Sequence, residues 1–510
     1  MNNFFKKANI TLYKGFLLLF LFSFILIFLN VIFNKTVYSY NTIFLILCML
    51  FFFSILGLFV VIFRLKENFF IKYYYVIVVA AAVVLFCLQL IFGFRIRFEP
   101  IWDLEAIYKG AITWVEQGTF TGYSSDTCHT DYFYIFPNNL GSMAFLAGIF
   151  KISNTLGCYD YFAVATIINS IMLVLSMLFV QAISRYFFGK TGGIWSIILF
   201  LSCLPFYFIS AVFYTDSLSI LFPLVAFYAL LKAESANKLS FKIIWYTLFA
   251  VMCLLGALIK MTVLIIVIAA IIYFLLKKKW REILLFVSIS IIIISSGFAT
   301  FNEYMYSNHL EKEKAESINM PILYWVDLAL HGDGRYNNEI FWTARNFDSQ
   351  EEKITYLKED IKTAVEELEL DGVLKLFEKK SARAFGDGTF ALSDFLDDRP
   401  VNNGFLPELL LYNGKYYSLY STVTTAVFLS LQVLMIISVF LEDNGFKLAI
   451  PKLSVFGIML FLLFWEINSR YITTFVPFII ICAVGGICYL TNNLKKTVFY
   501  SKLIEKRLSY

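Results

Sequence analysis

Charged side chains are scarce in this chain of 510 residues, at 15%, whereas 60% of the residues are hydrophobic. A soluble domain cannot bury so much apolar surface, so this composition excludes a soluble globular protein and indicates that lipid is the solvent. Histidine is also scarce, with three residues in all, and the residues around them fit no standard metal-binding spacing. We therefore expect a polytopic membrane protein without a bound metal.

Long apolar runs, by contrast, are abundant. A helix needs roughly 17 to 25 apolar residues to cross a bilayer, and such runs must be helical because lipid cannot satisfy open backbone groups. The sequence predicts about twelve spans, at residues 16–33, 42–63, 73–94, 161–184, 191–210, 213–231, 243–259, 262–276, 282–300, 418–441, 453–466 and 471–490. The first lacks a small-residue cleavage pattern and follows several lysines, so it is expected to be retained.

Lysine and arginine cluster between alternate spans, at residues 64–72, 185–190, 232–242, 277–281, 447–452 and 495–507. If every cluster is cytoplasmic, the loops between the twelve spans alternate between the two sides of the membrane as they must. Both termini are therefore predicted to be cytoplasmic. The apolar segment 138–152 is too short for a further span and is expected to be re-entrant or interfacial. The basic inner face suits an anionic lipid leaflet and not nucleic acid.

This topology divides the chain into four parts. Residues 1–72 hold two extra N-terminal spans, 73–300 the core with a first outer loop at 95–160, 301–415 an extracellular soluble domain, and 416–510 the last spans and a basic tail. The outer loop is expected to hold two membrane-surface helices, over 103–117 and 138–152. The predicted fold class is thus an all-α polytopic bundle of about 12 helices with juxtamembrane helices and a small α-rich outer domain.

Within the outer domain, residues 351–370 predict an amphipathic helix that ends at Asp371-Gly372. Its apolar residues recur at spacings of three and four: Ile354, Leu357, Ile361, Val365 and Leu368. The flanking stretches 331–337 and 386–389 are rich in Gly and Asp. They are either ordinary turns or loops that bend over the membrane surface.

Ionisable residues collect at the predicted outer ends of the spans. They are Asp103 and Glu105 after the third span, Asp216 after the fifth, Lys260 after the seventh, and Glu466, Arg470 and Tyr471 after the eleventh. Such residues are costly at a bilayer surface unless they have a function. Because they offer carboxylates for acid–base chemistry and cations for an anionic headgroup, they predict an active site on one face.

Each of these residues also has a purely structural interpretation. Asp103 and Asp216 can each cap the helix that follows. Lys260 can extend from a short loop to the interface, and Arg470 can anchor its helix there. The occurrence of all the sets on one bilayer face favours a shared function.

The order of these motifs resembles that of the C-type glycosyltransferase superfamily (GT-C). The closest pattern is that of its protein O-mannosyltransferase and aminoarabinose-transferase-like branch, and of Gram-positive members that modify cell-wall polymers. The resemblance covers about residues 73–490. It is carried by Trp102-Asp103, the run YIFPNNLG at 134–141, Tyr214-Thr215-Asp216, Ile259-Lys260, and Asn468-Ser469-Arg470-Tyr471 followed by Pro477.

The resemblance implies an inverting transfer of a sugar from an undecaprenyl-phosphate carrier to an outer cell-wall or surface polymer, such as a teichoic acid or polysaccharide, without a cofactor. It makes Asp103 the general base, with Glu105 in support. The donor phosphate would be held by Lys260, Arg470 and Tyr471. Acceptor-side or structural roles would fall to Asp216, Tyr134, Asn138 and Asn139.

Two alternatives remain open at this stage. A compact group, Asp126, Cys128, His129 and Asp131, suits a turn as well as a cation, and Cys128 has one outer partner, Cys158, for a disulfide if the two Cα atoms lie within reach. Twelve spans also describe secondary transporters and polysaccharide flippases. A transporter is disfavoured because paired interrupted spans are lacking and acidic residues are rare at mid-membrane depth. The expected location is the plasma membrane, with the active site outside.

Overall fold

The computed structural model describes residues 2–33, 37–38, 40–121, 131–347, 349–396, 399–441 and 446–508. Over these residues the chain is helical, and extended pairing is limited to one bridge between Phe98 and Pro400. Nine of the described helices are long and apolar enough to cross a membrane, and two shorter apolar helices accompany them. The predicted all-helical polytopic fold is confirmed.

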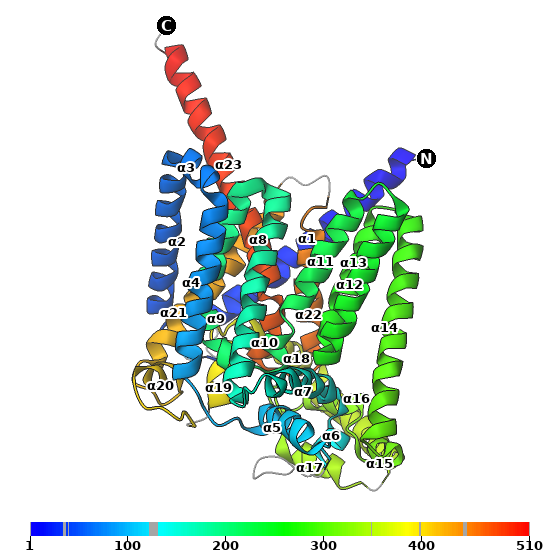
Figure 1. Cartoon of the computed structure of the whole chain (residues 1–510). Helices are drawn as coiled ribbons and strands as arrows, with labels where there is room; N and C mark the ends of the chain where they lie inside the picture. Colours follow the sequence, from blue (N-terminus) through cyan, green and yellow to red (C-terminus); the bar gives the residue numbers. More distant parts are fainter. Residues whose placement is uncertain are drawn as a thin grey trace.

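The long apolar elements form one bundle (Figure 1). Its helices are α1 (Asn2–Phe33), α2 (Thr42–Leu65), α4 (Tyr74–Arg95), α8 (Tyr161–Ser202), α11 (Leu221–Ser235), α12 (Leu239–Ile259), α13 (Ile265–Leu276), α14 (Trp280–Asn308), α21 (Tyr417–Ile437), α22 (Ala449–Leu463) and α23 (Val476–Leu508). Short helices between them are α3 (Glu67–Lys72), α9 (Pro205–Phe208) and α10 (Thr215–Leu218), with 3₁₀ turns η2 (Ile209–Ala211), η3 (Met261–Leu264), η4 (Ser438–Phe440) and η5 (Ser469–Phe475).

The helix α8 contains two of the predicted spans. Its backbone leaves the helical conformation at Gly189 (φ 68°, ψ −167°), which glycine tolerates because it has no Cβ. A Cβ on Gly193 would lie 3.2 Å from Nε2 of Gln181, so the second arm turns back along the first. Near the other end of the arms, Asn169 donates to the carbonyl of Ser210 at 3.1 Å. With α8 counted twice, the described helices make the twelve passes that the sequence predicts.

One end of the bundle carries both termini and the predicted inner basic clusters (Figure 1). Arg64 donates to the carbonyl of Thr491 at 2.9 Å, and Lys190 to that of Ile71 at 3.2 Å. Lys279 pairs with Glu234 at 2.8 Å. These contacts link clusters that lie far apart in the sequence, so the alternation from which the topology was predicted is present in the fold.

The opposite end carries the two segments predicted to lie outside, and we call it the lobe end (Figure 1). The first segment holds α5 (Trp102–Gln117), α6 (Tyr132–Ile135), η1 (Pro137–Asn139) and α7 (Leu140–Thr155). The second holds α15 (Lys312–Ile318), α16 (Ile322–Leu328), α17 (Asn338–Arg345), α18 (Gln350–Phe385), α19 (Leu392–Leu396) and α20 (Phe405–Leu410). The two predicted membrane-surface helices are present as α5 and α7.

The predicted outer domain has a small core of its own in its first half. Tyr324, Leu328, Phe341 and Leu357 are buried together there, and Ile135 of the first outer loop completes the cluster. The backbone joins the two segments as well, since the amide of Met320 donates to the carbonyl of Ile135 at 2.9 Å. The two outer segments therefore pack as one lobe.

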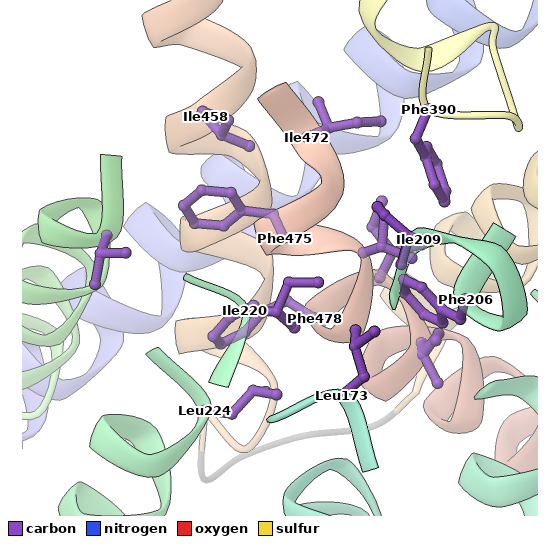
Figure 2. Close-up of a cluster of buried hydrophobic side chains, with 14 of the residues drawn as sticks. Leu173, Phe206, Ile209, Ile220, Leu224, Phe390, Ile458, Ile472, Phe475 and Phe478 are labelled. Carbon is purple, nitrogen blue, oxygen red and sulfur yellow. The ribbon is translucent and has the colours of Figure 1, made fainter. Parts of the chain in front are cut away.

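The second half of that segment returns to the bundle. The ring of Phe385 packs edge-on against Phe24 of α1, with 5.3 Å between centroids. Figure 2 shows Phe390 beside Phe206 and Ile209 in a buried cluster to which α8, α11, α22 and α23 also contribute. Residues 386–391 are therefore anchored in the bundle.

The predicted helix over 351–370 ends close to the expected position, because the backbone of α18 leaves the helical conformation at Glu369 (φ 52°, ψ −177°). A second helical stretch then runs on to Phe385. Two other expectations for this segment need correction. Val365 is 46% exposed, and the buried face of α18 passes through its neighbour Ala364. The stretch 386–389 does not bend over the membrane surface, because it packs so closely that a Cβ on Gly388 would lie 2.3 Å from the carbonyl oxygen of Thr424.

Candidate active site

Asp103 lies in the first turn of α5 at the lobe end. Its Oδ1 accepts a hydrogen bond of 2.7 Å from Tyr132, and its Oδ2 accepts one of 2.9 Å from Tyr214. The helix cap is Ile101, so Asp103 is inside the helix and the capping interpretation does not hold. Two phenolic hydroxyls fix the orientation of this carboxylate.

The predicted motif at residues 134–141 supports this arrangement through Asn139. Its side chain donates to the hydroxyl of Tyr132 at 2.5 Å, and Asn138 donates to Asn139 at 3.4 Å. Tyr134 points elsewhere, since its hydroxyl accepts from the amide of Glu311 at 3.3 Å. Asn138 and Asn139 are thus connected to Asp103, whereas Tyr134 attaches α6 to the segment before α15.

Glu105 lies two residues beyond Asp103 and therefore about 200° around the helix. Its side chain is 5% exposed and forms an ion pair of 2.6 Å with Lys109. The structure thus places Glu105 on another side of α5 from Asp103, where it stabilises the helix.

A second group of charges surrounds Asp216, which is 2% exposed within α10. Lys260 forms a salt bridge with its Oδ1, and Nε of Arg470 lies 3.9 Å from its Oδ2. Asp216 therefore does not serve as the cap of its helix, and Lys260 is paired instead of extending to the interface. Two cations and one carboxylate, brought from three distant parts of the sequence, sum to one positive charge when all three are ionised. Burial, followed by the charge of Arg470, lowers the pKa of Lys260 well below its ordinary value, and the carboxylate of Asp216 is its direct partner.

Aromatic rings connect this group to Asp103. The guanidinium carbon of Arg470 lies 4.9 Å from the ring centroid of Tyr214, whose hydroxyl binds Asp103. Tyr471 contributes a ring 5.2 Å from Arg470 and 4.9 Å from the ammonium of Lys260. Asp103 and the cations are therefore two sides of one site, with Tyr214 between them.

The position of Lys260 depends on the packing of α7 against the end of α12. A Cβ on Gly141 would lie 1.9 Å from the carbonyl oxygen of Leu258, so only glycine permits this approach. Ser142 donates to the carbonyl of Ile259 at 3.2 Å. The run at 134–141 thus serves the site at two points, through Asn138 and Asn139 beside Tyr132 and through Gly141 against α12.

Glu466 was expected at this end without a specific role, and Arg335 and Tyr336 were not among the expected site residues. Burial raises the pKa of Glu466 above its ordinary value, and the charge of Asp103 raises it further, whereas Arg470 lowers it. Burial, followed by the charge of Asp103, raises the pKa of Tyr336 to about 12. The amide of Ile467 also donates to the carbonyl of Gly334 at 2.7 Å. The stretch 331–337, expected as an ordinary turn or as a loop over the membrane surface, therefore lies beside the site.

Asp387 is another residue that sequence reasoning missed. Its carboxylate accepts from the amides of Thr389 and Ala391, at 2.8 and 3.0 Å, and from the hydroxyl of Ser469 at 2.6 Å. Ser469 precedes Arg470, so Asp387 fixes the start of η5. Phe395, a few residues further on, packs its ring 5.3 Å from the guanidinium of Arg470.

A cavity of about 310 Å³ adjoins the site at Asn468 and Ser469. Its wall is polar and rich in tyrosine, with contributions from the connection between α1 and α2, from 383–394 and from the start of α21. The lining includes Tyr38, Tyr40, Arg335, Arg383, Asp394, Tyr412 and Tyr417. The two extra N-terminal spans therefore contribute to the lobe end through the segment that joins them.

Asp126, Cys128 and His129 lie outside the described residues, so neither the proposed turn nor the disulfide is described. Cys158 has a free, exposed thiol, and Asp131 pairs with Lys314 at 2.8 Å.

Comparisons with known proteins agree with the membrane fold. Residues 1–487 match the model of a family described as conserved hypothetical integral membrane proteins. No curated protein matches the chain. Among solved structures, it is similar to ArnT from Cupriavidus metallidurans in the apo state, at 11% identity and a TM-score of 0.36, over 81% of this chain and 77% of that one.

Proposed function

The chain belongs to this family of conserved hypothetical integral membrane proteins, and we propose that it is an inverting membrane glycosyltransferase with a polyprenyl-phosphate sugar as donor. One observation carries the proposal. Tyr214 binds the carboxylate of Asp103 with its hydroxyl and stacks its ring under Arg470. A carboxylate and a cationic group thus lie side by side at the lobe end, which supports their roles as base and phosphate-binding site.

The cation group has the charge that a lipid-linked sugar phosphate requires. A sugar joined to a polyprenyl phosphate is a phosphodiester with one negative charge, and Lys260, Arg470 and Asp216 sum to one positive charge when all three are ionised. Asp216 Oδ2 and Arg470 Nε are both buried without a hydrogen bond in the described chain. Cations placed at the phosphate stabilise the charge that develops as it leaves.

Asp103 supplies the other half of the reaction. An acceptor hydroxyl oxygen bonds to the anomeric carbon as the bond to the phosphate oxygen breaks, and the hydroxyl proton passes to Asp103. Attack from the side opposite the phosphate inverts the anomeric carbon. Hydrogen bonds from Tyr132 and Tyr214 fix the orientation of the carboxylate.

The tyrosine-rich cavity suits the acceptor. Its volume of about 310 Å³ is at the lower end of the range of ligand pockets. Tyrosine rings pack against the apolar faces of sugars, and Asp394 and Arg335 offer acceptors and donors for hydroxyl groups. A hydroxyl-rich surface polymer, such as a teichoic acid or polysaccharide, is the proposed acceptor, on the extracellular side of the plasma membrane.

The test is a transfer assay with purified protein in lipid nanodiscs. Undecaprenyl-phosphate hexoses are supplied together with teichoic acid or polysaccharide, and labelled polymer is measured. Asp103→Asn should lower the rate by roughly 10² to 10⁴, and Arg470→Ala should abolish donor saturation. Glu116→Gln, which removes an exposed carboxylate from the same helix, is the matched control.

Two outcomes would overturn the proposal. One is the absence of transfer by the wild type from every undecaprenyl-phosphate hexose supplied, which would favour a flippase or transport role for the bundle. The other is undiminished transfer by Asp103→Asn, which would exclude Asp103 as the base.

A further inference from the structure

A cluster of one imidazole and two carboxylates lies in the lobe, outside the residues assigned to sugar transfer. Asp327 is near the end of α16, His331 follows one helical turn later, and Asp360 comes from α18. Nε2 of His331 lies 3.3 Å from Oδ1 of Asp327 and 3.2 Å from Oδ2 of Asp360. One potential ligand atom from each residue lies within 4.8 Å of the other two.

Asp327 is the most deeply buried member of the cluster, at 0% exposure, and neither of its carboxylate oxygens has a hydrogen bond within the described chain. Nε2 of His331 is likewise buried without one. Buried carboxylates occur in proteins when they are paired or coordinate a metal. A single imidazole nitrogen has at most one hydrogen to share between two carboxylates.

We propose that Asp327, His331 and Asp360 bind a divalent transition-metal cation through one nitrogen and two oxygen atoms. Bonds of about 2.0 to 2.1 Å around a tetrahedral ion place neighbouring ligand atoms about 3.3 Å apart, in agreement with both separations from His331. The imidazole ligand favours Zn²⁺ over Ca²⁺ and Mg²⁺, which prefer oxygen, and the two carboxylates also allow Mn²⁺ to bind.

The cluster is also accessible to an ion. The side chains of His331 and Asp360 are 30% and 25% exposed, whereas Asp327 closes the inner side. This partial opening gives the cation an entry path and leaves a coordination position for water.

Binding at this point fastens α16 to α18 and thereby fixes the backbone that faces the candidate active site. The carbonyl of Trp325 accepts from the amide of Glu466 at 3.1 Å, and that of Gly334 accepts from the amide of Ile467 at 2.7 Å. The rings of Trp325 and Trp465 also stack, 5.4 Å apart and 7° from parallel. The cation is thus a structural one that holds the turn 331–337 in place.

The test measures metal binding and does not depend on sugar transfer. Tag-free, full-length protein in detergent is stripped with a chelator and titrated with Mn²⁺, with free Mn²⁺ followed by electron paramagnetic resonance. One Mn²⁺ per chain is expected to bind, to be displaced by Zn²⁺, and to remain at an equal concentration of Ca²⁺. Asp360→Asn and His331→Gln should each weaken binding by at least about tenfold.

Glu359→Gln is the matched control, because it removes the neighbouring, exposed carboxylate of the same helix. It should leave Mn²⁺ affinity unchanged. The absence of a stoichiometric Mn²⁺ or Zn²⁺ site in the wild type overturns the proposal, and so does equal weakening by Glu359→Gln and Asp360→Asn. The partly exposed Asp360 and His331 keep the test valid even where substitution of the buried Asp327 prevents folding.

Discussion

The hydroxyl of Tyr214 donates a 2.9 Å hydrogen bond to Oδ2 of Asp103. Tyr214 directly precedes the short helix α10, and Asp103 lies in the first turn of α5, more than a hundred residues earlier. The same tyrosine ring lies under Arg470. One side chain therefore sets the spacing between the proposed base and the proposed phosphate site. Removal of its hydroxyl alone should impair the base and leave the phosphate site in place.

Tyr214→Phe keeps the ring and removes the hydroxyl. Hydrogen bonds to charged groups contribute about 1.5 to 3 kcal/mol, so transfer should fall by roughly 10- to 150-fold. The measurement is the rate of labelled-polymer formation at saturating donor. Tyr134→Phe, whose hydroxyl serves Glu311 instead, should leave the transfer rate unchanged, and an equal loss in both variants would contradict the assignment.

Lys260→Gln should destabilise the protein as well as weaken donor binding. It leaves Asp216, which is 2% exposed, with Arg470 at 3.9 Å as its remaining cation. Removal of one partner from a buried pair costs about 3 to 5 kcal/mol because the other charge is left uncompensated. The double variant Lys260→Gln/Asp216→Asn should recover part of this loss in thermal unfolding, while transfer stays low. Additive losses of stability would show that the two side chains are not coupled.

Gly141→Ala tests the contact that positions Lys260. The new Cβ would lie 1.9 Å from the carbonyl oxygen of Leu258, so α7 must move away from α12. Transfer and melting temperature should both fall. Gly148→Ala, in the same helix and with no atom within 4 Å of its Cβ, should instead be neutral or stabilise by up to about 1 kcal/mol through helix propensity. Similar behaviour of the two variants would remove the packing explanation.

Lys380 should make stability depend on pH. It donates to the carbonyls of Ala329, Leu463 and Trp465, at 2.8 to 3.1 Å. Burial lowers the pKa of its ammonium group to about 7, against about 10.4 in an unfolded chain. Between these values the unfolded state binds more protons, so the contribution of Lys380 to stability rises with pH.

The measurement is the unfolding free energy of the wild type and of Lys380→Met between pH 6.5 and 9.5. The unfolding free energy of the wild type minus that of Lys380→Met should grow with pH, by at most about 1.4 kcal/mol per pH unit. Lys379→Met, the exposed neighbour on α18, should give a curve parallel to that of the wild type. A parallel curve for Lys380→Met as well would exclude a lowered pKa.

The sequence by itself determined how many times the chain crosses the bundle and at which end each polar group lies. Apolar length and the placement of basic residues control both, because a bilayer admits only long apolar helices and orients them by charge. Asp103, Asp216, Lys260 and Arg470 were therefore assigned to one end without knowledge of their contacts.

Only the tertiary structure decided which of these groups meet. Lys260 pairs with Asp216, and Tyr214 with Asp103, because the C-terminal end of α12, the first turn of α5 and the short elements α10 and η5 meet at one place. Asp387 and Phe390 enter the bundle from a segment with the composition of a surface turn, and Asp327, His331 and Asp360 assemble from α16, the turn that follows it, and α18. Periodicity shows which face of a helix is apolar, but partners distant in sequence are chosen by close packing, which one sequence does not display.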